Sequence, residues 1–166
     1  VYLRRGKEES LERCHPWIFS GAIERITEGL KPLSEGDIVD VYTKQGNFIA
    51  RGHYQIGSIA VRVLSFEEES IDQAWWNRRI AAAKALRESL GMVDNAQTSC
   101  YRLIHGEGDL LPGLVVDIYE RTAVVQCHSV GMYHSRSQIA EAIREAYGAS
   151  FWGMMGNMMN FLAYLF

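Results

Sequence analysis

The sequence contains little cysteine and no pattern of cysteine pairing. Its 166 residues include three cysteines, Cys14, Cys100 and Cys127, which are odd in number and far apart. Small proteins stabilised by disulfides instead carry an even set of closely spaced cysteines. The simplest interpretation is that these thiols are reduced, and we expect a cytoplasmic protein. The N-terminal segment agrees with this expectation, because it is charged from Arg4 onward and does not have the character of a signal peptide.

An excess of positive charge is also lacking. The formal net charge is −3 and the isoelectric point is near 6.0. Residues 1–66 carry 9 Lys/Arg and 8 Asp/Glu, and residues 67–166 carry 8 and 12. This balance gives no global signal for nucleic acid and decides nothing alone. The hydrophobic content of 48% is ordinary for a soluble globular protein, and the length fits one large or two small domains.

Charged residues are absent from the C-terminal segment. The 21 positions from Ala146 onward contain none, and they hold four of the six methionines. That length would permit a membrane span. Asn157 and Asn160 would lie near the centre of such a span, however, and no basic flank follows, so we expect no membrane insertion. We expect this segment to pack on the preceding domain. A partly disordered or self-associating tail is the alternative.

Metal-binding and nucleotide-binding signatures are missing as well. The chain has no Cys-x-x-Cys and no His-x-x-x-His spacing, so we expect no structural zinc. The run Gly106-Glu107-Gly108 is not a dinucleotide-binding loop. Leu111 occupies its third glycine position, and Pro112 follows where a helix should begin.

One group of carboxylates invites a catalytic interpretation. Glu107, Asp109 and Asp117 lie near a predicted strand end, and His105 adjoins them. A tight turn, in which Asp and Gly serve the backbone, explains the same residues. No activated nucleophile and no oriented base can be named among them, so we assign no catalytic residue.

Three consecutive β-strands are the clearest feature that is present. The strands are predicted at Ile38–Tyr42, Phe48–Tyr54 and Ile59–Ser65. Gly46 can adopt the positive φ that a tight connection between the first two strands requires. Three short antiparallel strands cannot close a core alone, so the flanking segments must complete this unit.

The flanking segments contain further predicted elements. Additional strands are expected at Val1–Arg4, Ile23–Ile26, Cys100–Ile104, Leu114–Ile118 and Ala123–Cys127, and a short helical turn at Lys7–Arg13. A long helix should begin with Ser70 as N-cap in a capping box with Gln73 and end at Leu90. A second helix should follow Ser135 and end at Gly148.

The long helix has a predicted buried face. Helical periodicity places on one arc the residues Trp75, Trp76, Ile80, Ala82, Ala83, Leu86 and Leu90. Arg79 falls inside this arc. We expect it either to extend its charged end to solvent or to pair with a carboxylate, in a structural role.

Several runs of residues resemble one enzyme family. The runs are Val1-Tyr2-Leu3-Arg4-Arg5-Gly6-Lys7-Glu8-Glu9-Ser10-Leu11, His15-Pro16-Trp17-Ile18-Phe19-Ser20-Gly21-Ala22, Gly36-Asp37-Ile38-Val39, Ala50-Arg51-Gly52-His53-Tyr54, Tyr101-Arg102-Leu103-Ile104-His105-Gly106-Glu107-Gly108-Asp109 and Leu111-Pro112-Gly113-Leu114. Together they resemble bacterial class I 23S rRNA (cytosine-5)-methyltransferases, which use S-adenosylmethionine and carry an N-terminal PUA domain. The resemblance covers about residues 1–148.

The resemblance implies an α+β chain with two parts. Residues 1–69 would be a small PUA-type β-pseudobarrel that binds RNA. Residues 70–166 would be the start of a mixed α/β domain with an antiparallel sheet, truncated or altered after about residue 149. The family's catalytic domain, with its glycine-rich S-adenosylmethionine loop and catalytic cysteines, has no counterpart in this sequence. We therefore expect no cofactor in this chain, and S-adenosylmethionine only in the full-length family enzyme.

The predicted RNA-binding residues combine cations with aromatic and imidazole groups. They are Arg4, Arg5, Lys7, His15, Arg51, His53 and Tyr54. The alternative for the first three is a solvated edge, paired with Glu8, Glu9 and Glu12. Trp17 and Phe19 are expected in the core rather than as stacking platforms, because such apolar runs are usually buried.

The resemblance thus implies recognition of ribosomal RNA on behalf of a methyltransferase, without methyl transfer by this chain alone. A binding or assembly module that forms a homodimer through residues 150–166 or a sheet edge is the main alternative. A degenerate enzyme with a site around Glu107 and Asp109 is a third hypothesis.

Overall fold

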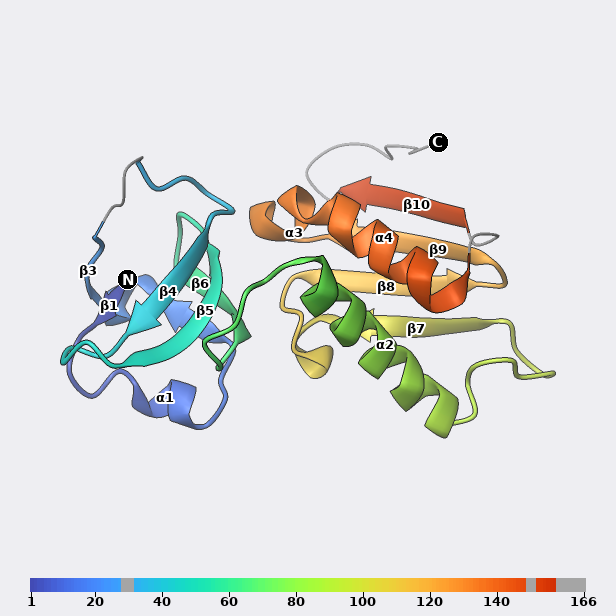
Figure 1. Cartoon of the computed structure of the whole chain (residues 1–166), viewed down its shortest axis with the longest axis horizontal. Helices are drawn as coiled ribbons and strands as arrows, with labels where there is room; N and C mark the ends of the chain where they lie inside the picture. The colour runs from blue at the N-terminus through green and yellow to red at the C-terminus, as the bar shows by residue number, and fades with distance from the viewer. Residues whose placement is uncertain (28–31, 149–151, 158–166) are drawn as a thin grey trace. The chain divides into compact units, whose positions relative to one another are not determined.

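The computed structural model describes residues 1–27, 32–148 and 152–157 (Figure 1). It consists of two compact units. The first comprises Val1–Glu69 with Ser129–Gly131, and the second comprises Ser70–His128 and the residues from Met132 onward. Each unit has its own sheet, and each is described by itself below. The predicted α+β class is confirmed.

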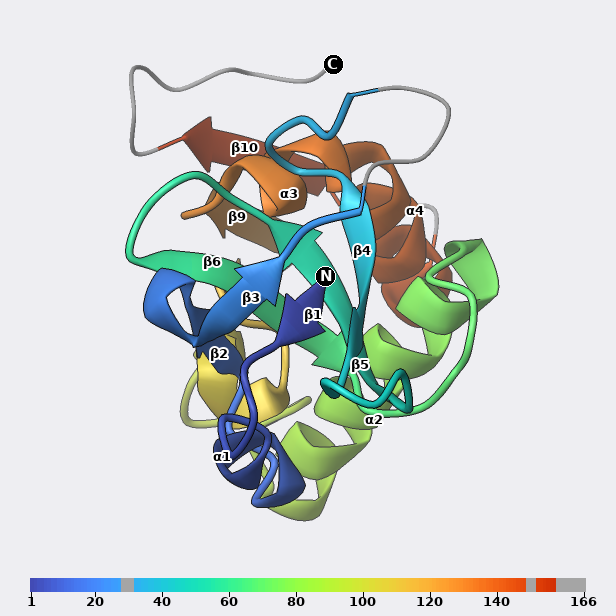
Figure 2. The same cartoon turned by 90° about the vertical axis from the view of Figure 1, so that its left-hand side faces the viewer.

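The first unit is a six-stranded sheet that curls on itself (Figure 2). Its strands are β1 (Tyr2–Leu3), β2 (Trp17–Phe19), β3 (Ile23–Arg25), β4 (Ile38–Tyr42), β5 (Phe48–Tyr54) and β6 (Ile59–Ser65), in the order β2-β6-β5-β4-β1-β3. The β1–β4 pair is parallel and the other pairs are antiparallel. The one-turn helix α1 (Glu9–Glu12) and the 3₁₀ turn η1 (Ser20–Ala22) lie before and after β2.

Alternation along the strands builds the core of this unit. In β4, Val39 and Val41 are buried while Ile38 is 42% exposed, so alternate residues face inward. The core cluster comprises Val1, Leu3, Leu11, Ile18, Val39, Val41, Ala50, Val61 and Val63. The predicted β4–β5 hairpin is confirmed. Gly46 has φ +92°, and the Thr43 N–H donates to the Asn47 carbonyl at 2.8 Å.

The second unit is a four-stranded sheet with helices. The strands are β7 (Cys100–His105), β8 (Leu114–Tyr119), β9 (Thr122–Cys127) and β10 (Trp152–Asn157), in the order β10-β9-β8-β7. β7, β8 and β9 are antiparallel, and β10 runs parallel to β9. The helices are α2 (Gln73–Ser89), α3 (Val130–His134) and α4 (Arg136–Tyr147), and the 3₁₀ turn η2 spans Gly106–Asp109. β10 was not predicted as a strand, and residues 158–166 lie outside the described residues.

The start of α2 differs from the prediction. Asp72, not Ser70, is the N-cap, and its Oδ1 accepts a hydrogen bond from the Trp75 N–H at 2.9 Å. An aspartate caps a helix as well as serine does, and it adds a negative charge at the positive end of the helix dipole. The capping box assigned to Ser70 and Gln73 was therefore wrong by two positions.

The buried face of α2 is also rotated relative to the prediction. Trp75, Trp76, Ile80, Ala83 and Arg87 are buried, as expected for the first four. Leu86 and Leu90, predicted to be buried, are 48% and 63% exposed, and Ala82 is exposed too. The helix packs against α4 and β7. The side chain of Arg87 turns inward to the carboxylate of Asp109, which lets an arginine occupy the buried face. A hydrophobicity pattern would not have chosen an arginine for that position.

Candidate nucleic-acid interface

Three cations gather where β1 gives way to α1. Gly6 has φ +77°, and the Lys7 N–H donates to the Arg4 carbonyl at 3.1 Å, which closes a turn between them. Arg4, Arg5 and Lys7 are all exposed. Arg4 is fixed to η1 and β3, since its backbone N–H donates to Ala22 O at 2.8 Å and its Nε to Ile23 O at 3.1 Å. The turn therefore holds these cations close together on one edge.

The expected alternative for these cations was an edge neutralised by neighbouring carboxylates. Among the described residues, neither Arg5 nor Lys7 forms an ion pair with Glu8, Glu9 or Glu12. Helix α1 has four residues, too few for its N-terminus to add an anion site. Any attraction for phosphate here comes from the side-chain charges alone.

His15 is held by its neighbours in the chain. It follows α1 after Cys14, which adopts φ +58°. The Trp17 N–H donates to His15 Nδ1 at 3.2 Å. The imidazole also meets the Trp17 ring edge-on, with the ring centroids 5.9 Å apart. His15 is exposed, so this contact orients its ring toward solvent at the start of β2.

Strand β2 places two aromatic rings outside the core. Ile18 is 3% exposed, whereas Phe19 is 50% exposed and Trp17 is partly exposed. The expectation that Trp17 and Phe19 belong to the core was wrong. β2 is an end strand of the sheet, and side chains alternate along it, so only Ile18 can point inward. The two rings are perpendicular, with centroids 6.4 Å apart.

These aromatic residues border a pocket. Its volume is about 330 Å³, and it is lined by Lys7, Ser10, Leu11, Trp17, Ile18, Phe19, Gly21 and Ala22. Most of these side chains are apolar, and the lining residues with polar side-chain groups are Lys7, Ser10 and Trp17, whose indole carries an N–H donor. We call this cavity the β2 pocket. It brings one of the predicted cations together with two rings that the sequence did not assign to a site.

The predicted residues of β5 lie elsewhere. Arg51 donates through Nε to Asp40 Oδ1 at 2.6 Å and through Nη1 to the Glu69 carbonyl. The hydrogen bond from Arg51 lowers the pKa of Asp40 and raises the pKa of Arg51 itself. His53 is 2% exposed, and Tyr54 packs partly against the core cluster. None of these three lines the β2 pocket, in contrast to Lys7.

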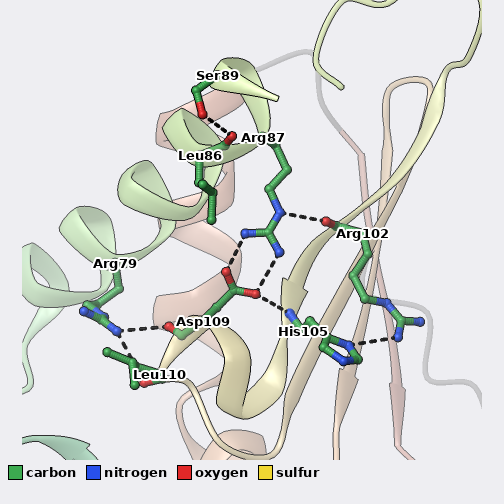
Figure 3. Close-up of polar contacts among 8 residues, drawn as sticks. All are labelled: Arg79, Leu86, Arg87, Ser89, Arg102, His105, Asp109 and Leu110. Atoms are coloured by element: carbon green, nitrogen blue, oxygen red, sulfur yellow. Dashed lines mark hydrogen bonds and ion pairs between the residues drawn. The ribbon is translucent and has the colours of Figure 1, made fainter. Parts of the chain in front are cut away.

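The carboxylates near η2 have a structural partner. Asp109 accepts hydrogen bonds from both Nη1 and Nη2 of Arg87, the latter at 2.8 Å, and from the His105 N–H at 2.6 Å (Figure 3). The side chains of Arg87 and Asp109 are 10% and 6% exposed. A bidentate arginine with a backbone donor uses the acceptor sites of this carboxylate. Asp109 therefore fixes the turn and is not poised for proton transfer.

Arg79 has the structural role that was expected, with a different partner. Its Nη2 donates to the backbone carbonyl of Asp109 at 3.0 Å, and its guanidinium lies 5.7 Å from the Trp75 ring centroid. The side-chain carboxylate of Asp109 pairs with Arg87, whereas Arg79 contacts the backbone carbonyl of the same residue. The burial of Arg87 was not predicted from the sequence. The feature that could have indicated it is its position four residues after Ala83, on the same face of α2.

The second unit has a pocket of its own, of about 490 Å³. Its lining includes Lys84, Asp94, Tyr101, Arg121 and Tyr147. The hydroxyls of Tyr101 and Tyr147 lie 2.9 Å apart, and burial raises the pKa of both phenols. Lys84 is engaged by the Ala146 carbonyl at 3.0 Å and by Glu88 at 3.3 Å. The lining mixes both signs of charge and favours no one class of ligand.

The described residues contain neither a membrane-spanning helix nor a cluster of metal ligands. No helix in residues 1–27, 32–148 or 152–157 is long and apolar enough to cross a bilayer. Within the same residues, no three His, Cys, Asp or Glu side chains are grouped as a metal site requires.

Comparison with known proteins gives a consistent relationship. Residues 1–66 match the family described as a PUA-like domain. The chain is 42% identical over 149 residues to the ribosomal RNA large subunit methyltransferase I of Photobacterium profundum. The proteins of the same name from Vibrio vulnificus and Escherichia coli are 39% identical over 148 residues and 40% identical over 149. Each match covers 89% of this chain but 36% of the relative, so the chain spans about a third of the length of these relatives.

Solved structures share the fold. A protein from Streptococcus mutans described as a SAM-dependent methyltransferase superposes with a TM-score of 0.83 at 18% identity. The match covers 100% of this chain and 42% of that chain. A methyltransferase structure complexed with SAH gives the same values. At this identity the likeness concerns the fold alone.

The glycine run Gly106-Glu107-Gly108 does not have the form of a loop that holds S-adenosylmethionine. The glycine run that could be compared with a cofactor loop forms η2, and it is followed by Leu110 at φ +56° and by Pro112. The run therefore turns back into β8 and does not open a helix whose N–H groups could hold a ligand. We assign no step of methyl transfer to these residues.

Proposed function

We propose that this chain is the RNA-recognising portion of an S-adenosylmethionine-dependent methyltransferase that acts on cytosine C5 of large-subunit ribosomal RNA. The observation that carries the proposal is the exposed Arg4-Arg5-Lys7 turn beside the aromatic β2 pocket, in a unit that matches a PUA-like domain. The names of the sequence relatives supply ribosomal RNA as the ligand.

The proposed RNA contacts are Arg4, Arg5, Lys7 and His15. Each exposed cation that meets a phosphate releases condensed counterions, so affinity falls with salt in proportion to the number of contacts. Three arginine or lysine contacts on a structured RNA would give a clear salt dependence despite the net charge of −3. Arg51, His53 and Tyr54 are left out of this surface, because an ion pair or burial occupies them.

Methyl transfer is not expected from this chain by itself. The glycine run at η2 does not have the form of a cofactor loop, and the relatives are almost three times as long as the matching segment. We propose that S-adenosylmethionine binds to a further domain of the full-length enzyme, and that the enzyme is cytoplasmic.

The test is a salt titration of binding to fragments of large-subunit rRNA. Lys7→Ala and Arg5→Ala should each weaken binding and each reduce the slope of log affinity against log salt by about one. Lys44→Ala is the matched control. Lys44 is an exposed cation of the same unit, but it lies in the turn between β4 and β5 and forms an ion pair with Glu24. Equal affinity in all four proteins, or wild-type binding independent of salt, would contradict the proposal.

Self-association is a second candidate, favoured by one observation. In the described part of the sheet, β10 is an end strand whose only partner is β9. An end strand offers unpaired backbone groups to another chain. Light scattering on the full chain and on a chain ending at residue 149 tests this candidate. A monomer in both cases would reject it.

A further inference from the structure

We propose that the β2 pocket receives a single unstacked nucleobase, so that the first unit selects single-stranded or distorted RNA over regular duplex. This inference rests on the proposed RNA-binding function and names the form of RNA that the same surface takes. It depends on the shape, the lining and the surroundings of the pocket.

The shape of the pocket suits one planar group. Trp17 and Phe19 both line it, and their rings stand at 90° to each other. A flat ligand can therefore lie against the face of one ring and meet the edge of the other, the two arrangements that aromatic groups prefer. The volume of about 330 Å³ is at the lower end of the range of ligand pockets, roughly 300–1,000 Å³, which suits one ring system.

The residues that line the pocket favour stacking on a base over hydrogen bonds that would distinguish one base from another. Leu11, Ile18 and Ala22 offer apolar contact, whereas Ser10, Lys7 and the indole of Trp17 carry the side-chain hydrogen-bonding groups. Every base has an apolar face, so a lining of this kind accepts any base and discriminates weakly among the four. A base paired within a helix has both faces covered, and it cannot enter without being unstacked.

The surroundings favour a nucleotide over an apolar side chain of a protein. Lys7 itself lines the pocket, and Arg5 precedes it in the same exposed turn. A base in the pocket carries a phosphate on each side, which these cations can meet. An apolar side chain of a protein would pack against the two aromatic rings but would make no ionic contact with Lys7 or Arg5. The carboxylates of α1, Glu9 and Glu12, do not line the pocket.

Gly21 provides a way to close the pocket without removing a ring or a charge. It lines the pocket, its φ is not positive, and a Cβ added there would meet no atom within 4 Å. Gly21→Leu should therefore fold normally and occupy space that a base needs. Phe19→Ala removes the more exposed ring. Ile56→Ala is the matched control, because Ile56 is an apolar side chain of the same unit that is 71% exposed and does not line the pocket.

The experiment measures binding of a labelled single-stranded oligoribonucleotide and of the same sequence as a duplex. The wild-type chain and Ile56→Ala should prefer the single strand. Gly21→Leu and Phe19→Ala should each lose about 5- to 150-fold in affinity for it, the range found when one base–aromatic stack is removed. A second series of oligoribonucleotides carries one abasic nucleotide, placed at each position in turn. At one position the abasic nucleotide should lower the affinity of the wild-type chain by a similar factor. The same nucleotide should not lower the affinity of Gly21→Leu. Thermal unfolding of each variant checks that the fold is kept.

The outcomes separate this inference from the proposed function. Salt-dependent binding that is weakened by Lys7→Ala but unchanged in Gly21→Leu and Phe19→Ala would overturn the base pocket and leave RNA binding intact. Equal affinity for single strand and duplex would also overturn it. Absence of salt-dependent binding to any RNA would overturn the proposed function itself. Normal RNA binding by both pocket variants would thus leave the pocket to a ligand other than RNA.

Discussion

The carboxylate of Asp109 accepts hydrogen bonds from both terminal nitrogens of the Arg87 guanidinium, across 22 positions of the sequence. Both side chains are nearly buried, at 10% and 6% exposed. The pair ties α2 to the turn that follows β7, and the same carboxylate caps the backbone of that turn through the His105 N–H (Figure 3). It explains why an arginine occupies the buried face of α2.

Removing one partner of this pair should destabilise the protein strongly. Asp109→Asn or Arg87→Met leaves a buried charge without its counterion, which costs about 3–5 kcal/mol of the free energy of unfolding. Urea unfolding measures the change. Arg144→Ala is the control, because Arg144 pairs with Glu141 on the exposed side of α4, and its urea midpoint should stay as in the wild type. If the urea midpoint of Asp109→Asn shifted no more than that of Arg144→Ala, the structural role of the pair would be contradicted.

The pair of Asp40 with Arg51 should make stability depend on pH. Arg51 holds the pKa of Asp40 below its ordinary value, so the folded state favours the carboxylate. The resulting stabilisation is present above the unfolded pKa of aspartate, about 3.9, and is lost as pH falls through the lower folded pKa. The difference in unfolding free energy between wild type and Asp40→Asn should therefore shrink between about pH 5 and pH 2. If this difference in unfolding free energy stayed constant between about pH 5 and pH 2, the lowered pKa of Asp40 would be rejected.

The three cysteines should react in two classes. Cys14 and Cys100 are exposed, whereas Cys127 is buried, and its burial raises the pKa of the thiol to about 11. Because the thiolate is the reactive form, a disulfide reagent at pH 7.5 should label Cys14 and Cys100 rapidly. Cys127 should react only after denaturant is added. Mass spectrometry after a short exposure locates the labels, and early labelling of Cys127 would show that β9 is open to solvent.

Two glycines should tolerate a methyl group very differently. A Cβ at Gly52, in β5, would lie 2.2 Å from the Arg62 carbonyl oxygen of the adjacent strand β6. Gly52→Ala must push the two strands apart, and overpacking of this kind costs about 1–3 kcal/mol. Gly21→Ala meets no neighbour and should change the thermal midpoint little. Similar midpoints for the two variants would show that β5 and β6 do not approach as closely as described.

Local sequence determined the regular elements well. Strands β4, β5 and β6 have the predicted bounds. β4 and β6 are rich in β-branched residues, and Gly46 can take the positive φ of the hairpin that leads into β5. The α+β class and the PUA-like first unit followed from motifs that are each continuous in the chain. The cation turn at Arg4, Arg5 and Lys7 could be found for the same reason, since its members are neighbours in sequence.

Tertiary contacts decided the remainder. Whether Phe19 is core or surface depends on which edge of the sheet β2 occupies, and that position is set by its pairing with β6. Arg51 appeared free in sequence, yet the register of β4 against β5 places Asp40 directly opposite it. Arg87 can lie on the inward face of α2 because the distant Asp109 pairs with it. Helical and strand periods fix how side chains alternate, but only the partner across the sheet or helix interface decides which side is buried and which is left for a ligand.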